Sequence, residues 1–149
     1  MRHSFLTKAL ATAIAVTALT TVSVSGAATA APTPPVAAPQ AATAVVNLGL
    51  TATQAKHVQC FLAYGWEYNG LIDGALGTNS WKAMQRYLAA QDYSDYNGAI
   101  DGIVGPQTVM ALQRALKRAW GYTGLIDGVA GPGTQAAFAR FSETAKGYC

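Results

Sequence analysis

YNGAIDGIVGPQT, residues 96–108, is one of three close copies of the same phrase in a chain of 149 residues. The other copies are YNGLIDGALGTNS, which begins at Tyr68, and YTGLIDGVAGPGT, which begins at Tyr122. The aspartates of successive copies lie 28 and 26 residues apart. Spacing of this size is typical of a repeated supersecondary unit that buries its apolar side against its neighbours.

Each copy contains an Asp-Gly pair, which favours a tight turn. The carboxylate can accept nearby backbone N–H groups, and glycine adopts the positive φ that other residues resist. We assign a structural turn role to three pairs: Asp73 with Gly74, Asp101 with Gly102, and Asp127 with Gly128. The isoleucine before each aspartate is expected to insert between helices as an apolar plug. We expect no metal, because calcium usually gathers several oxygen ligands and each turn offers one carboxylate.

The segments between the turns have the apolar spacing of amphipathic helices. The expected stripes are Leu112, Ala115, Leu116 and Ala119; Trp81, Met84 and Leu88; and Phe138, Phe141 and Ala145. A capping box of Thr51 and Gln54 predicts a further helix that contains VQCFL, which aligns with the later MQRYL and LQRAL. The expected fold is therefore all-α, a small orthogonal array of about four helices joined by three repeated Asp-Gly turns.

The composition divides the chain into three parts. Residues 1–30 have a basic start, a short apolar run and a small-x-small pattern ending at Ala30, which predict a secretory signal peptide. The alternative is an uncleaved membrane anchor. Residues 31–47 form a linker rich in proline and alanine, and residues 48–149 form the helical domain.

The charge of the chain gives no basis for nucleic acid or an anionic membrane as a partner. The sequence has 10 basic and 7 acidic side chains. Cleavage of the signal removes Arg2 and Lys8, which leaves a net charge near +1. Binding to phosphate-rich partners needs clustered cationic charge.

Two cysteines, Cys60 and Cys149, are expected to form a disulfide. A chain with a signal peptide enters an oxidising compartment, where such a bond persists. A small domain gains most from a link that closes nearly all of its length. The alternative is a metal or nucleophile site of Cys60 with His57, but two ligands do not make a zinc site.

The units resemble those of a known family. GLIDGALG…SWKAMQRY, GAIDGIVGPQTVMALQRAL and GLIDGVAGPGTQAAFARF are similar to the helix-turn-helix units of the peptidoglycan-binding domain 1 family, over roughly residues 55–143. The matching residues of the second unit are Asp101, Gly102, Gly105, Thr108, Ala111 and Leu112. Those of the third unit are Asp127, Gly128, Gly131, Thr134 and Ala137.

The resemblance implies a secreted, all-helical module that binds the wall polymer in a shallow groove beside the turns. Two features depart from the family pattern. Family domains usually have two units and accompany an enzyme, whereas this sequence has a third unit and no enzyme. In addition, the first unit has Thr78-Asn79-Ser80 where the others have Pro-x-Thr, so its helix start is expected to differ.

One aromatic pair precedes each turn, and these pairs are the candidate ligand-binding residues. Aromatic rings with polar tips suit sugar faces, amides and carboxylates. The candidates are Trp66 and Tyr68, Tyr93 and Tyr96, and Trp120 and Tyr122. Together they would form a strip on one side of the array. The alternative is that the three motif tyrosines close the small core, while Trp66 and Trp120 remain surface platforms.

No catalytic residues and no cofactor are expected. The predicted mature chain has one histidine and a cysteine expected to be in a disulfide. Its repeated aspartates occupy equivalent turns, which gives no asymmetric acid and base. We expect a secreted, wall-associated monomer that is not an enzyme and binds peptidoglycan glycan or stem peptide, with a secreted wall enzyme as a further partner. The alternative function is an exported protein-interaction or inhibitor module.

Overall fold

The computed structural model describes residues 44–149. The predicted signal peptide and most of the predicted linker therefore lie outside the described residues. The described part belongs to one compact unit, Pro39–Cys149.

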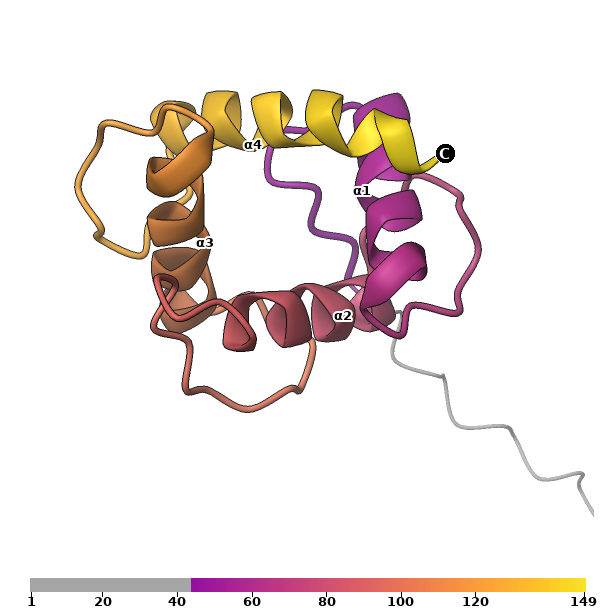
Figure 1. The fold of residues 1–149 in the computed structure, drawn as a ribbon, viewed down its shortest axis with the longest axis horizontal. Coiled ribbons are helices and arrows are strands. Elements are labelled where there is room, and N and C mark those ends of the chain that lie inside the picture. Colours follow the sequence, from indigo (N-terminus) through magenta and orange to yellow (C-terminus); the bar gives the residue numbers. More distant parts are fainter. Residues whose placement is uncertain (1–43) are drawn as a thin grey trace, which may run out of the picture. The chain divides into compact units, whose positions relative to one another are not determined.

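Four α-helices form a closed frame, which confirms the all-α prediction. They are α1 (Ala52–Gly65), α2 (Thr78–Ala89), α3 (Pro106–Ala119) and α4 (Pro132–Ala145), and a short 3-10 helix, η1 (Lys146–Tyr148), follows. Each helix packs on the next one along the chain, and α4 packs on α1 (Figure 1). No strand occurs between residues 44 and 149.

The helix starts follow from local sequence. Thr51 and Gln54 form the capping box that the sequence predicts at α1. The other three helices begin directly after a glycine N-cap, and α3 and α4 have proline in their first turn, where a missing N–H is tolerated. The first unit was expected to start its helix differently, but α2 begins at Thr78, one residue after Gly77, in the register of the other units.

The core fills the centre of the frame. Its largest fully buried apolar side chains are Trp81, Phe138, Leu62, Leu76, Met84, Leu88, Leu112 and Leu116. The predicted stripes therefore face inward, with the exception of Ala119, which is exposed at the end of α3.

The apolar plug differs between the turns. In the first two turns it is not the isoleucine that the sequence suggested, because Ile72 is 40% exposed and Ile100 is 37% exposed. The residue three positions after the aspartate packs on the core there instead, as the buried Leu76 and the partly buried Val104 show. In the third turn the isoleucine Ile126 is partly buried and packs against the core, as predicted.

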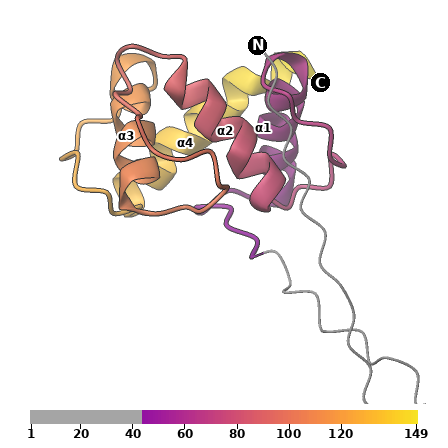
Figure 2. The same cartoon turned by 90° about the horizontal axis from the view of Figure 1, so that it is seen from below.

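Residues 44–50 lie along one face of the frame (Figures 1 and 2). Leu50 is buried in the core, and the backbone of Val46 bonds to Leu76 and to the indole of Trp81. The side chain of Asn47 bonds to Gly74 and Leu76 in the first turn. Val46 and Asn47 fall within the predicted linker, yet both are held by the helical domain.

The disulfide between Cys60 and Cys149 is present, as predicted, and joins α1 to the residue that follows η1. The two Cα atoms are 5.3 Å apart, and 89 positions of sequence separate the cysteines. Of the helices described, none has the length and apolar character needed to cross a membrane.

Candidate functional site

A buried glutamine holds each turn to the helix before it. Gln59, Gln85 and Gln113 are fully buried. Each side-chain amide donates to the turn aspartate, at 2.9, 3.0 and 2.8 Å respectively. Each amide oxygen accepts the backbone N–H of the glycine that follows this aspartate, at 2.8, 2.8 and 3.0 Å. Because a buried amide must be hydrogen-bonded, these contacts fix both the turn and the helix.

The glutamines are residues that the sequence analysis did not single out. Their signal was visible, because they occupy the same position in VQCFL, MQRYL and LQRAL. The aligned position in α4 is Ala139, and α4 continues into η1 and the disulfide without an Asp-Gly turn. This difference fits a role for the glutamine in holding the turn.

The turn glycines have the backbone that the Asp-Gly pattern predicts. Gly74, Gly102 and Gly128 have φ values of 83°, 78° and 75°. A Cβ at Gly102 would lie 2.4 Å from the carbonyl oxygen of Thr78, the first residue of α2. Glycine is therefore required both by the positive φ and by the close approach of the turn to the preceding helix.

The three motif tyrosines are structural parts of the turns. Tyr68, Tyr96 and Tyr122 are less than 10% exposed, and each hydroxyl donates at 2.6 Å to a carbonyl three residues later. Their rings lie against Gly70, Gly98 and Gly124, where a Cβ would come within 3.0 Å of the ring or hydroxyl. The tyrosines thus present an edge to the turn surface and bury the rest of the ring.

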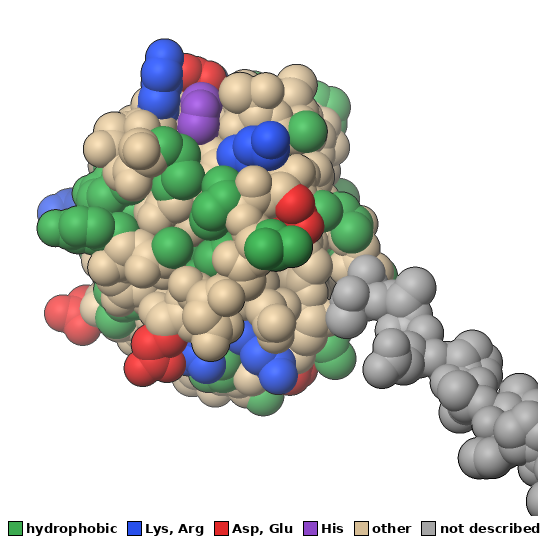
Figure 3. Space-filling model, turned by 90° about the vertical axis from the view of Figure 1, so that its right-hand side faces the viewer, with side chains coloured by type: hydrophobic (Ala, Val, Ile, Leu, Met, Phe, Trp, Pro, Cys, Tyr) green, Lys and Arg blue, Asp and Glu red, His purple; other side chains and the backbone are tan. Residues whose placement is uncertain are grey.

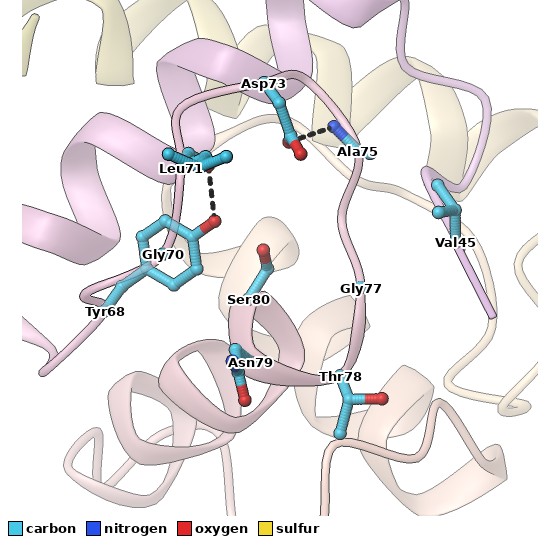
Figure 4. Close-up of a pocket in the computed structure, with 10 residues that line it drawn as sticks. All are labelled: Val45, Tyr68, Gly70, Leu71, Asp73, Ala75, Gly77, Thr78, Asn79 and Ser80. Atoms are coloured by element: carbon cyan, nitrogen blue, oxygen red, sulfur yellow. Dashed lines mark hydrogen bonds between the residues drawn. The ribbon is translucent and has the colours of Figure 1, made fainter. Parts of the chain in front are cut away.

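An open hollow lies between the first turn and the start of α2. Its volume is about 380 Å³. In Figure 4 the carboxylate of Asp73 points into this hollow from the turn, and the hydroxyl of Ser80 points toward it from α2. The remaining lining residues are Val45, Tyr68, Gly70, Leu71, Ala75, Gly77, Thr78 and Asn79.

The third unit contains a matching hollow of about 250 Å³. All nine of its lining residues are the sequence equivalents of residues in the first hollow: Tyr122, Gly124, Leu125, Asp127, Val129, Gly131, Pro132, Gly133 and Thr134. We name the two spaces hollow 1 and hollow 3. Leu71 and Leu125 occupy the same position at their rims and are 78% and 80% exposed.

In the second unit a glutamine side chain reaches across the equivalent position. Gln107, the second residue of α3, donates from Nε2 to Oδ1 of Asn97 at 2.8 Å. Its Oε1 lies 2.9 Å from the position of a Cβ at Gly98. The equivalents of Gln107 are the shorter Asn79 in the first unit and Gly133 in the third. The second unit also has Ala99 where the other two have an exposed leucine.

The aspartates at the two hollows are ionised at neutral pH. Hydrogen bonds from Gln59 and from the backbone of Ala75 hold the pKa of Asp73 below its ordinary value. Gln113 and the backbone of Val129 do the same for the pKa of Asp127. In each carboxylate these bonds go to Oδ1. The second oxygen can therefore accept hydroxyl or amide N–H groups from a ligand, whereas a ligand carboxylate would be repelled.

The other predicted site residues lie elsewhere. Trp66 is partly buried against Tyr87, with ring centroids 5.2 Å apart. Trp120 is partly buried against Phe141, at 4.9 Å, and lines a separate cavity of about 210 Å³. Tyr93 is 39% exposed beneath the guanidinium of Arg118. The six aromatic residues therefore do not form one strip, because the three turns lie on different sides of the frame (Figure 1).

That separate aromatic cavity lies at the C-terminal halves of the helices. Its other lining residues are Phe61, Tyr87, Phe141, Thr144, Ala145 and Tyr148. Burial raises the pKa of Tyr87, so this phenol is neutral throughout the working pH range. The indole of Trp120 donates to Thr144 at 3.3 Å, which orients the ring at the edge of the cavity.

Within residues 44–149, no three histidine, cysteine, aspartate or glutamate side chains come together as a metal site would require. In comparisons with protein families, curated proteins and solved structures, the chain shows no significant match.

Proposed function

We propose that this protein is a secreted, non-catalytic protein that binds bacterial peptidoglycan through hollow 1 and hollow 3. The observation that carries the proposal is the recurrence of one hollow, with equivalent lining residues, beside two of the three turns. The resemblance of these turns to peptidoglycan-binding units supports the same choice of ligand. Localisation at the cell wall would follow from this affinity.

The chemistry of the hollows suits an N-acetylated sugar. Such a sugar offers hydroxyl and amide donors, which the free oxygens of Asp73 and Asp127 can accept. It also offers a methyl group and ring C–H surfaces. Exposed leucines at both rims, Leu71 and Leu125, can cover these apolar surfaces.

A binding role without catalysis fits the same residues. Each turn aspartate is committed by Oδ1 to a glutamine and to a backbone N–H. A general acid needs a raised pKa, and these carboxylates have pKa values below the ordinary range. They are placed to hold hydroxyl groups instead of protonating a leaving group.

A second candidate function is an exported protein-interaction module. One observation favours it: Tyr64 is 79% exposed and Tyr148 is 45% exposed, and their rings lie 5.1 Å apart beside the aromatic cavity. The side of the molecule that carries α1 also shows hydrophobic side chains, with charged side chains around them (Figure 3). A protein partner would bind at these exposed rings.

Sedimentation with purified insoluble peptidoglycan tests whether the protein binds this polymer through the two hollows. The Leu71→Ser/Leu125→Ser variant should lose most of the retention of the oxidised parent, because it removes the apolar rim of both hollows. These side chains are exposed, so the fold should remain intact. The control is Tyr64→Ser/Ile103→Ser, which removes exposed apolar side chains outside both hollows and should be retained like the parent. Failure of the folded parent to sediment would reject the proposed ligand.

A further inference from the structure

We infer that the protein bridges two separate strands of the wall polymer, one at hollow 1 and one at hollow 3. This inference rests on the proposed function and adds the number and direction of the binding sites. It also assigns Gln107 as the residue that keeps the second unit from binding.

The turns that line hollow 1 and hollow 3 belong to different sides of the frame. The loop of the first unit projects beyond α1, and the loop of the third unit projects beyond α3, on opposite sides of the frame (Figures 1 and 2). The helix that spans the frame between these sides is α4, which has 14 residues. At 1.5 Å per residue, the sides are separated by about 20 Å. Two strands that each contact one of these loops would therefore be held on opposite sides of the domain.

The second unit would offer a third direction, but we infer that Gln107 blocks a ligand there. Gln107 reaches across it to Asn97 and lies against Gly98. This contact depends on side-chain length, because Asn79 at the same position leaves hollow 1 open even though Asn69 is available as the equivalent of Asn97. The protein is therefore bivalent, although it has three turns of the same kind.

Three variants exchange the features that open or close the units. Asn79→Gln should close hollow 1, because the longer side chain can reach Asn69 in the way that Gln107 contacts Asn97. Gly133→Gln with Thr123→Asn should close hollow 3. Position 133 has room for a side chain, since the nearest atom to a Cβ there is 3.6 Å away. Gln107→Gly copies the Pro-Gly start of α4 and should open a third site.

Light scattering with soluble glycan strands of peptidoglycan, each several disaccharides long, measures bridging. Sedimentation of the same variants with insoluble peptidoglycan measures binding. The oxidised parent should bind strands and enlarge the particles, and a large excess of protein should shrink them again. A variant with only one hollow closed should still bind strands but should not enlarge the particles. Closure of both hollows should abolish binding, and Gln107→Gly should give larger particles than the parent.

The parent should also be retained on insoluble wall more strongly than either single closure, by about 10²-fold or more, because two linked sites bind with avidity. A parent that binds strands without enlarging particles would overturn the inference and leave the proposed function standing. A variant with one hollow closed that still enlarges the particles would also overturn the inference, because self-association of the protein would then explain the enlargement. A parent that binds no strands and no wall would reject both.

Discussion

At the scale of single residues, the fold depends on one glutamine in each of the first three helices. The amide of Gln113 donates to Tyr122, Asp127, Val129 and Thr134 and accepts from Gly128. No sequence pattern for turns contains this residue, because the turn itself is complete in the Asp-Gly pair. Its recurrence in three aligned segments is visible in the sequence, but its role becomes evident when the helix is placed against the turn.

Removal of this amide should destabilise the protein strongly. Gln113→Ala leaves the N–H of Gly128 and the acceptors of the third turn without their buried partner, so we expect a loss of about 2–4 kcal/mol in the free energy of unfolding. Denaturant unfolding of the oxidised protein measures it. Gln135→Ala, which removes a single hydrogen bond to Ala130, should cost about 1 kcal/mol or less. Equal losses in the two variants would show that the amide network does not hold the turn.

The turn aspartates make stability depend on pH. The pKa of Asp127 is lowered in the folded protein, first by Gln113 and then by the backbone of Val129. Its stabilising effect is therefore fully present above the unfolded pKa of about 3.9 and is lost as the pH falls through the lower folded pKa. The stability difference between the parent and Asp127→Asn should thus be largest at neutral pH and should narrow below about pH 4.

Thermal unfolding from pH 7 down to pH 2 checks this prediction. Asp92→Asn serves as the control for net charge, since Asp92 is exposed and lies outside the three turns. A difference between Asp127→Asn and the parent that stays constant over this range would contradict the account.

At the scale of elements, the sequence predicted the helices well because the features that determine them are local. The capping box at Thr51, the glycine before each later helix and the apolar stripes all lie within a few residues of the feature they determine. The plug of the first two turns was assigned to the wrong residue because the direction of a side chain near a tight turn depends on the turn geometry. Ile72 and Leu76 are both apolar, and composition alone does not separate them.

The candidate site was harder to predict than the helices. The sequence placed it near the turns, and hollow 1 and hollow 3 do lie there. The sequence-based prediction relied on aromatic residues, but Trp66 and Trp120 pack against the core. Whether a hollow is open depends on the reach of one side chain across a space, as Gln107 shows, and such a contact leaves no periodic signal.

The disulfide links the first helix to the segment after the last one, which closes the frame covalently. Its 89-residue separation gives a chain-entropy contribution of about 4–5 kcal/mol in the loop-closure model. The Cys60→Ser/Cys149→Ser variant should therefore be less stable by up to this amount. Denaturant unfolding of the variant and of the parent with and without reductant measures it. An unchanged midpoint in the reduced parent would show that packing of η1 on α1 suffices to close the frame.

At the scale of the whole molecule, a ring of four helices directs its three turns to different sides. An array whose turns faced one way would present a continuous strip to a single ligand. In this frame, α4 returns to α1, so the first and third turns project in opposite directions (Figure 1). This arrangement supports the proposal of two separate binding sites.

The most direct test of the account is an NMR titration of the oxidised protein with soluble disaccharide fragments of peptidoglycan. Binding at the two hollows should change the backbone amide shifts of residues 70–80 and 124–134, which line hollow 1 and hollow 3, and should leave those of residues 98–108 nearly constant. Shifts that gather around Trp120 and Tyr148 at the aromatic cavity would contradict it. Equal shifts in all three turns, or none in any turn, would contradict it as well.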